Sequence, residues 1–304
     1  MSWQRLGFVY RPDGSKVWAR SHAALPLPLQ IEPDVYRIFF STRDALNRSS
    51  VGWADVDLSS TPRVLREASE PVLTPGEDGT FDDNGISIGS LIRTDDGVRL
   101  YYMGWNLGVR AAWRNAIGLA QARTALNAFE PYSQGPILDR SPEDPYTLTY
   151  PCVIQRSSHD WLMWYGSNVT PNTSNIRHLI KVARSRDGIR WERNREVAID
   201  FAAPGEHVIV RPTVIDFSDG LLMCFASRGE HYRIGAAWSI DGEHWRRLDA
   251  VMELGPSISG WDSEMTCYPA LFLHRERLWL VYNGNGYGLT GFGLAVWQGP
   301  FPYR

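Results

Sequence analysis

The sequence predicts an all-β protein, a five-bladed β-propeller formed by residues 1–304 as a single domain. An aromatic-rich strand recurs five times at intervals of roughly sixty residues, at 36–40, 100–104, 161–165, 221–225 and 278–282. Each copy is followed by a strand with a three-residue pattern that ends in alanine. The first residue of this pattern is glycine in four of the five copies. These strands contain residues 52–54, 118–120, 181–183, 235–237 and 293–295. Repeats of this length, built from three or four strands, are typical of propeller blades.

An apolar strand precedes each aromatic-rich strand and is expected to lie innermost in its blade. Short turns such as residues 95–97 and 218–220 join the two strands. Aligning these turns places the innermost strands at residues 26–30, 88–92, 150–154, 211–215 and 268–272. Three of them open on a residue followed by proline, namely Tyr150, Arg211 and Tyr268. Proline is tolerated at the start of a strand, where no ladder donor is needed.

The outer strands carry two further signals. The pattern Ser-x-Asp-Gly-x-x-Trp occurs at residues 185–191 and 239–245 and predicts a tight turn into an outer strand whose tryptophan covers the blade edge. The segment 3–10 is an apolar strand without a neighbour in sequence, whereas the last repeat has only three strands. We therefore expect the N-terminal strand to complete the last blade, which closes the ring and removes its edges.

Composition excludes several classes of function. The net charge of −3 is spread over both signs, so no basic field of the kind needed for nucleic-acid binding is present. No apolar run has the length of a signal peptide or a membrane span, which predicts a cytoplasmic protein without a membrane partner. Cys152, Cys224 and Cys267 lie in apolar strands without metal-site spacing, so we expect free buried thiols. No cofactor or metal motif is found.

The chemistry of a propeller is expected where the innermost strands begin, because these positions converge on the central channel. The residues four positions before the strand openings are His22, Asn84, Tyr146, His207 and Glu264. Two segments there, 81–85 and 260–265, place acids between an aromatic residue and an apolar strand, where burial raises a carboxyl pKa. Asp83 and Glu264 are the catalytic candidates, since two facing carboxylates suffice to cleave a glycosidic bond. Their neighbours Asp82 and Asp262 either face the channel or cap turns.

Polar and aromatic residues around the same rim suit a saccharide. Arginine and amide groups bind sugar hydroxyls or an anionic substituent, and indole or phenol faces bind the apolar side of a pyranose. A charge at Arg211, where two other blades have tyrosine, implies an anionic partner in the channel. The predicted substrate-binding residues are Arg43, Asp44, Asn84, Trp105, Asn106, Arg114, Tyr150, His207, Arg211, Arg228, Tyr232, Arg233, Asp262, Asn283 and Asn285.

These repeats and phrases resemble the five-bladed β-propeller glycoside hydrolase superfamily, which includes families 43, 32, 68 and 130. The resemblance covers nearly the whole chain. It is closest to stand-alone members that carry the phrases found here at 81–85, 113–120, 137–142, 211–215 and 260–269. Such members accompany surface-polysaccharide and sugar-modification genes, which implies a biosynthetic or editing role. The resemblance also implies an Asp base, an orienting second Asp and a Glu acid.

Only part of that catalytic set matches this sequence. Asp83 and Glu264 have the expected separation if the second blade takes the place of the family's first blade. The third carboxylate is missing: blade one offers His22, and blade four offers His207 and Arg211 with Glu206 adjacent. Three hypotheses follow, all with a small carbohydrate or sugar conjugate as partner. They are a glycosidase-like enzyme, a phosphorylase or glycosyl-transferring enzyme that uses the arginines, and a carbohydrate-binding propeller without activity.

Overall fold

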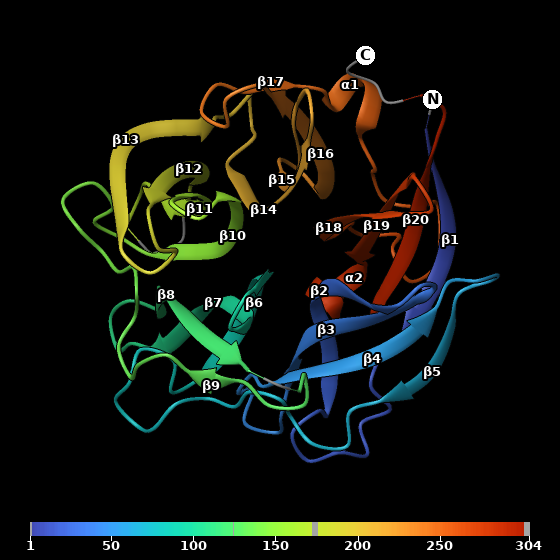
Figure 1. Ribbon diagram of the computed structural model, residues 1–304, viewed down its shortest axis with the longest axis horizontal. Coiled ribbons are helices and arrows are strands. Elements are labelled where there is room, and N and C mark those ends of the chain that lie inside the picture. Colours follow the sequence, from blue (N-terminus) through green and yellow to red (C-terminus); the bar gives the residue numbers. More distant parts are fainter. Residues whose placement is uncertain (1, 124, 172–175, 301–304) are drawn as a thin grey trace.

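The computed structural model describes residues 2–123, 125–171 and 176–300, and its regular secondary structure is almost entirely β-strand (Figure 1). Three separate four-stranded sheets and one eight-stranded sheet make up the fold. The eight-stranded sheet has two four-stranded halves, joined by a single parallel pair between His178 and Val208. We call the three sheets and the two halves units one to five, in chain order. Figure 1 shows these units arranged around a common centre, with the first strand beside the last.

The strands of each unit follow one another antiparallel from the centre outward. Unit one contains β2 (Ser21–Glu32), β3 (Val35–Arg43), β4 (Val51–Asp57) and β5 (Arg63–Glu67). Unit two contains β6 (Gly85–Thr94), β7 (Gly97–Leu107), β8 (Trp113–Ala122) and β9 (Glu130–Pro131). Unit three contains β10 (Leu148–Ser157), β11 (Asp160–Asn168), β12 (His178–Ser185) and β13 (Trp191–Ile199).

The last two units include the short helices. Unit four contains β14 (Val208–Phe217), β15 (Gly220–Arg228), β16 (Tyr232–Ser239) and β17 (Arg246–Arg247), and α1 (Asp249–Met252) follows it. Unit five contains β18 (Cys267–His274), β19 (Arg277–Asn283), β20 (Phe292–Gln298) and β1 (Ser2–Tyr10), with α2 (Asn285–Gly288) between β19 and β20. The predicted pairing of the N-terminal strand with the last repeat is confirmed, since β1 pairs antiparallel with β20 and places Trp3 opposite Trp297.

Hydrogen bonds between side chains and strand backbones join most of the neighbouring units. In each of these bonds a side-chain oxygen accepts a backbone N–H from the innermost strand of the next unit. The pairs are Ser41 with Ile88 at 3.1 Å, Ser90 with Val153 at 2.9 Å, Thr213 with Leu271 at 3.1 Å and Asn283 with Leu25 at 2.7 Å. The last bond connects unit five to unit one, so the two ends of the chain's repeat series meet.

The glycine signature of the third strands is explained by close packing. A Cβ atom at Gly118 would lie 2.4 Å from the ring of Tyr102, and one at Gly293 would lie 2.4 Å from the ring of Trp261. Both separations are far shorter than van der Waals contact, so a side chain there would displace a buried aromatic ring. In unit three the equivalent residue, Lys181, instead directs its ammonium group to the buried carboxylate of Asp144 at 2.8 Å.

The predicted turns and thiols are also confirmed. In the Ser-x-Asp-Gly-x-x-Trp segments, the Ser185 and Ser239 hydroxyls accept the N–H groups of Gly188 and Gly242 at 2.9 and 2.8 Å. The three cysteines are buried and free. Within the described ranges, no helix has the length and apolar character needed to cross a membrane.

Candidate functional site

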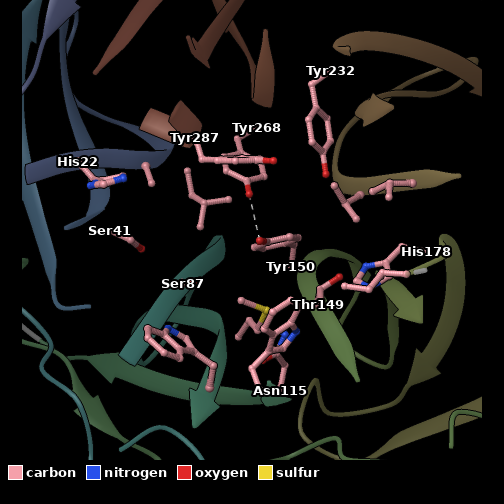
Figure 2. A pocket seen from close by; sticks show the side chains of 18 of the residues that line it. His22, Ser41, Ser87, Asn115, Thr149, Tyr150, His178, Tyr232, Tyr268 and Tyr287 are labelled. Atoms are coloured by element: carbon pink, nitrogen blue, oxygen red, sulfur yellow. Dashed lines mark hydrogen bonds between the residues drawn. The ribbon is translucent and has the colours of Figure 1, made fainter. Parts of the chain in front are cut away.

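A cavity of about 690 Å³ lies where the units converge, and each unit contributes side chains to it (Figure 2). Its walls combine indole, phenol, imidazole, guanidinium, amide and hydroxyl groups. The polar and aromatic lining residues are His22, Ser41, Arg43, Asn47, Ser87, Trp105, Trp113, Asn115, Thr149, Tyr150, His178, His207, Arg228, Tyr232, Tyr268 and Tyr287. Clefts of this volume typically hold small-molecule ligands.

Three innermost strands begin one to three residues earlier than predicted, at Leu148, Val208 and Cys267, and the residues predicted to open them have an unusual backbone conformation. Tyr150, Arg211 and Tyr268 have φ angles of 42°, 57° and 51°, and each precedes a proline. The ladder register shifts at the same three places, which marks a β-bulge in β10, β14 and β18. Positive φ is uncommon for such side chains, and a following proline restricts the backbone further. Strained residues of this kind persist only where their surroundings hold them, which is common at binding sites.

The bulges bring two tyrosine hydroxyl groups together in the cavity. The hydroxyl oxygens of Tyr150 and Tyr268 lie 3.2 Å apart, the distance of a hydrogen bond (Figure 2). Burial is the main cause that raises the pKa of both side chains above their usual range. Both phenols therefore stay protonated at neutral pH, so one donates to the other and the second keeps a proton for a ligand.

Two guanidinium groups lie near this tyrosine pair. Their charges act to lower the pKa of Tyr150, but burial has the larger effect and the pKa stays raised. Arg43 lines the cavity and stacks on Trp105, with its Cζ atom 5.1 Å from the ring centre. Arg211 lies outside the lining and is only 1% exposed. Its Nη1 donates to the carbonyl of Gly89, whereas Nε and Nη2 are buried without a partner. Burial lowers the pKa of Arg211 to about 10, so it remains charged at neutral pH.

Two imidazoles of the cavity, the buried His178 and the half-buried His22, are neutral at neutral pH. Burial lowers the pKa of His178 to about 4, and both of its ring nitrogens are buried without a hydrogen-bond partner. The pKa of His22 is also lowered to about 4, first by burial and then by the charge of Arg43. Neutral imidazoles offer one donor and one acceptor each, which suits sugar hydroxyl groups.

No aspartate or glutamate lines this cavity within residues 2–123, 125–171 and 176–300. Three buried acids in the loops before innermost strands are held elsewhere by tyrosine hydroxyls. Tyr102 donates to Asp82 at 2.8 Å, Tyr165 to Asp144 at 2.9 Å and Tyr282 to Asp262 at 2.8 Å. Across the same described ranges, no cluster of three or more His, Cys, Asp and Glu side chains could hold a metal ion.

Six predicted binding residues line the cavity: Arg43, Trp105, Tyr150, His207, Arg228 and Tyr232. The predicted catalytic pair does not. One Asp83 carboxylate oxygen accepts the N–H of Gly79 at 3.0 Å and the other is buried without a partner, and the side chain of Glu264 is exposed.

The other predicted binding residues make local structural contacts. Asp44 accepts the N–H groups of Leu46 and Arg48 within its own turn, and Asn84 accepts that of Leu107. Asn106 donates to Thr80, Asn285 accepts the N–H of Glu264, and Asp262 is bonded by Tyr282 and Arg5. Asn283 is fully buried between units five and one, Arg233 pairs with Glu253 at 3.4 Å, and Arg114 is exposed. Apart from the exposed Arg114, these side chains share one reason: their polar atoms bind the backbone of turns and strands or a nearby charged or hydroxyl group.

The cavity also contains residues that the predicted set lacks, among them Ser41, Ser87, Asn115 and His178. Strand alternation is the signal that could have found two of them. Ser41 stands two residues before Arg43 and Asn115 two residues after Trp113, so each shares a strand face with a cavity residue. His178 opens a third strand, and no periodicity marks it.

Comparison with known proteins extends these observations. The chain is 45% identical over 298 residues to two Mycobacterium tuberculosis proteins, "Uncharacterized protein MT1551" of strain CDC 1551 / Oshkosh and "Uncharacterized protein Rv1502" of strain ATCC 25618 / H37Rv. Each match covers 97% of this chain and 99% of the relative. No family model matches the chain.

Several solved structures with the same fold are glycoside hydrolases by title. One named "Glycoside hydrolase" has a TM-score of 0.77 at 16% identity and covers 99% of this chain and 93% of its own. A thermostable family-43 glycoside hydrolase has a TM-score of 0.69 at 14% identity, with 90% and 88% covered. A Bombyx mori GH32 beta-fructofuranosidase in complex with sucrose has a TM-score of 0.61 at 14% identity, with 91% and 61% covered.

The identity to the mycobacterial proteins spans almost both full lengths, and the likeness to the solved structures concerns the fold. The chain therefore belongs to the same protein family as the two Mycobacterium tuberculosis proteins, and it has the fold of the family-43 and GH32 glycoside hydrolases.

Proposed function

We propose that residues 1–304 form one five-bladed β-propeller domain and that the protein cleaves or transfers a glycosidic bond of a small or activated glycoside held in the central cavity. The five units would be the blades, with the N-terminal strand completing the last one. The fold shared with glycoside hydrolases supports the class of reaction, and the groups that line the cavity support a saccharide as ligand.

The observation that carries this proposal is a set of unsatisfied polar atoms around the cavity. The indole N–H of Trp105, the amide oxygen of Asn115, the hydroxyl of Thr149 and both nitrogens of His178 are buried without a hydrogen-bond partner. Leaving a buried polar group unpaired costs about 1–3 kcal/mol. Sugar hydroxyl groups, which donate and accept, would satisfy donors and acceptors together, and the ring faces of Trp105 and Trp113 would contact the apolar side of a pyranose.

Asp83 and Glu264 are proposed as the base or nucleophile and the acid of this reaction. Asp83 has one buried carboxylate oxygen without a hydrogen-bond partner, and it directly precedes Asn84, which accepts the N–H of the cavity residue Leu107. Glu264 stands four residues before Tyr268 in the segment that leads into β18. Both carboxylates would then act from the rim on a glycoside whose sugar occupies the cavity.

Turnover of a panel of nitrophenyl glycosides tests the assignment. Loss of a positioned acid or base lowers the rate by about 10²–10⁴-fold, which is the result expected for Asp83→Asn and for Glu264→Gln. Asp96→Asn, in the exposed turn between β6 and β7, is the matched control and should keep full activity. Full activity of Glu264→Gln would contradict its role as acid.

A second candidate is a carbohydrate-binding propeller without catalysis. It is favoured by one observation, the lack of a carboxylate among the described residues that line the cavity. Calorimetric titration with the same sugars distinguishes the two. Saturable binding without turnover of any glycoside would support the binding protein, and turnover abolished in Glu264→Gln would support the enzyme.

A further inference from the structure

The described residues at the cavity carry an excess of positive charge. Arg43 and Arg228 line it and Arg211 lies buried beside its tyrosine pair, whereas no carboxylate lines it in the described part of the chain. No ion pair to an acid is found for these three arginines among the described residues, although the ion pairs of surface arginines are numerous. Buried cations are normally paired or hydrogen-bonded, because removing an unpaired charge from water is costly.

Arg43, Arg211, Tyr150 and Tyr268 form one cluster. The positive charges of both arginines act to lower the pKa of Tyr150. Tyr150 and Tyr268 in turn act to raise the pKa of each arginine. Arg211 is anchored from behind, because its Nη1 donates to the carbonyl of Gly89 in unit two. The two tyrosine hydroxyls share one hydrogen bond at 3.2 Å. The free polar groups of the cluster are therefore N–H and O–H donors, and the acid whose charge acts on Arg43, Asp44, lies outside the cavity lining.

The strained backbone keeps this arrangement in place. Tyr150, Arg211 and Tyr268 all have positive φ at a bulge before proline, and such conformations are strained. A regular strand opening would be less strained but would point these side chains along the alternating faces of the sheet. The bulges instead collect the two hydroxyls beside the two guanidinium groups. A preformed set of donors with excess positive charge is the arrangement that binds an oxyanion.

We propose that Arg43, Tyr150 and Tyr268, supported by Arg211, form an oxyanion subsite that binds a carboxylate or phosphate group of the saccharide ligand, or a free phosphate that acts as co-substrate. This inference rests on the proposed function for the saccharide part of the ligand. Arg43 contacts the anion directly and can bind it through two N–H groups, while one tyrosine hydroxyl donates a further bond. Arg211 is a positioning residue: it lies outside the cavity lining and adds its positive charge near Tyr150.

Calorimetric titration of the purified protein, with all probes compared at the same ionic strength and the comparison repeated at rising NaCl concentrations, tests the subsite. The probes are glucose, glucuronate, glucose 1-phosphate and inorganic phosphate. We expect at least one anion to bind at least about tenfold more tightly than glucose, and its affinity to fall as NaCl rises while that of glucose does not. Tight binding of glucuronate or glucose 1-phosphate but not of phosphate identifies a substituent on the sugar, whereas tight binding of inorganic phosphate identifies a co-substrate.

Three variants assign the effect to Arg43. Arg43→Met should lose the anion preference and keep the affinity for glucose within about threefold, and Arg43→Lys should retain part of the preference because it keeps the charge without the planar fork. Arg190→Met removes a charge of the same type from an exposed turn and should change nothing. If Arg43→Met does not fold, the salt dependence of the unmodified protein and the Arg43→Lys titration still test the oxyanion subsite.

The inference and the proposed function fail in different ways. Equal affinity for glucose and for all three anions, or equal effects of Arg43→Met and Arg190→Met, would overturn the oxyanion subsite even if neutral glycosides were cleaved. Tight, Arg43-dependent binding of an anionic sugar without turnover of any glycoside would remove the proposed reaction and leave the subsite standing.

Discussion

The hydroxyl group of Tyr282 donates a hydrogen bond of 2.8 Å to the carboxylate of Asp262, a side chain that is 2% exposed. The same pairing recurs twenty or twenty-one residues apart in two other units, as Tyr102 with Asp82 and Tyr165 with Asp144. These aspartates belong to the scaffold of their units, because the tyrosine of the second strand holds the loop before the innermost strand. Asp262 is thereby turned away from the cavity that it was predicted to line.

Tyr282→Phe should lower the free energy of unfolding by about 1–3 kcal/mol, because it leaves the buried Asp262 carboxylate with Arg5 as its remaining side-chain partner. Urea denaturation measures the loss. Tyr132→Phe, at a position that is 49% exposed, is the control and should be close to neutral. A stable Tyr282→Phe variant with impaired sugar binding would instead assign the pair to the site.

Protonation of His178 should destabilise the folded protein in acid. Its pKa is 6.5 in the unfolded chain and about 4 in the folded protein, because burial disfavours the charged ring. Unfolding therefore takes up a proton between these pH values, and stability falls as the pH falls through this window. The unmodified protein should lose roughly 3 kcal/mol relative to His178→Phe between pH 7 and pH 4. Parallel pH profiles of the two proteins would refute the assignment.

Trp105→Ala should weaken the binding of any sugar that occupies the cavity. The indole supplies both a ring face and a buried N–H without a partner, and Arg43 stacks on the same ring. We expect at least about a tenfold loss of affinity by calorimetry. Trp53→Ala is the matched control, because Trp53 also carries a stacked arginine, Arg37 at 3.7 Å, but lies outside the cavity. An equal loss in both variants would show a general structural effect.

Asn283→Ala should destabilise the contact between the last unit and the first. The Asn283 amide accepts the N–H of Leu25 at 2.7 Å and donates to the carbonyls of Ala23 and Gly291 at 2.8 Å each. Three buried backbone groups lose their partners, so we expect at least about 3 kcal/mol of lost stability. Asn127→Ala, at an exposed position, is the control for thermal unfolding. Unchanged stability with lost sugar binding would restore the predicted binding role of Asn283.

The strands could be predicted from the sequence because their signals are local. Alternation, turn residues and a repeat of roughly sixty residues each act over a few neighbouring positions. The N-terminal strand was predictable for a related reason, since the last repeat lacked a fourth strand and 3–10 lacked a partner. The same repeat located the cavity, and it identified Tyr150, His207 and Arg43 as residues near its wall.

The direction of individual side chains could not be predicted in this way. Glu264 stands four positions before its predicted strand opening and Asp83 stands next to Asn84, which has the same offset, yet a turn decides whether a carboxylate points to the axis or to its own backbone. Arg211 precedes a proline at a bulge as Tyr150 does, but its side chain is buried and donates to the carbonyl of Gly89, 122 residues away in sequence.

The sequence by itself therefore determined the repeat, the strand order and the ring of positions from which a site could be built. Only the tertiary structure decided which side chains line the cavity and which make structural hydrogen bonds instead. The physical reason is that pairs such as Tyr150 with Tyr268 or Tyr282 with Asp262 form across units or between a strand and a preceding loop. Their geometry depends on bulges and packing distances that no local pattern encodes.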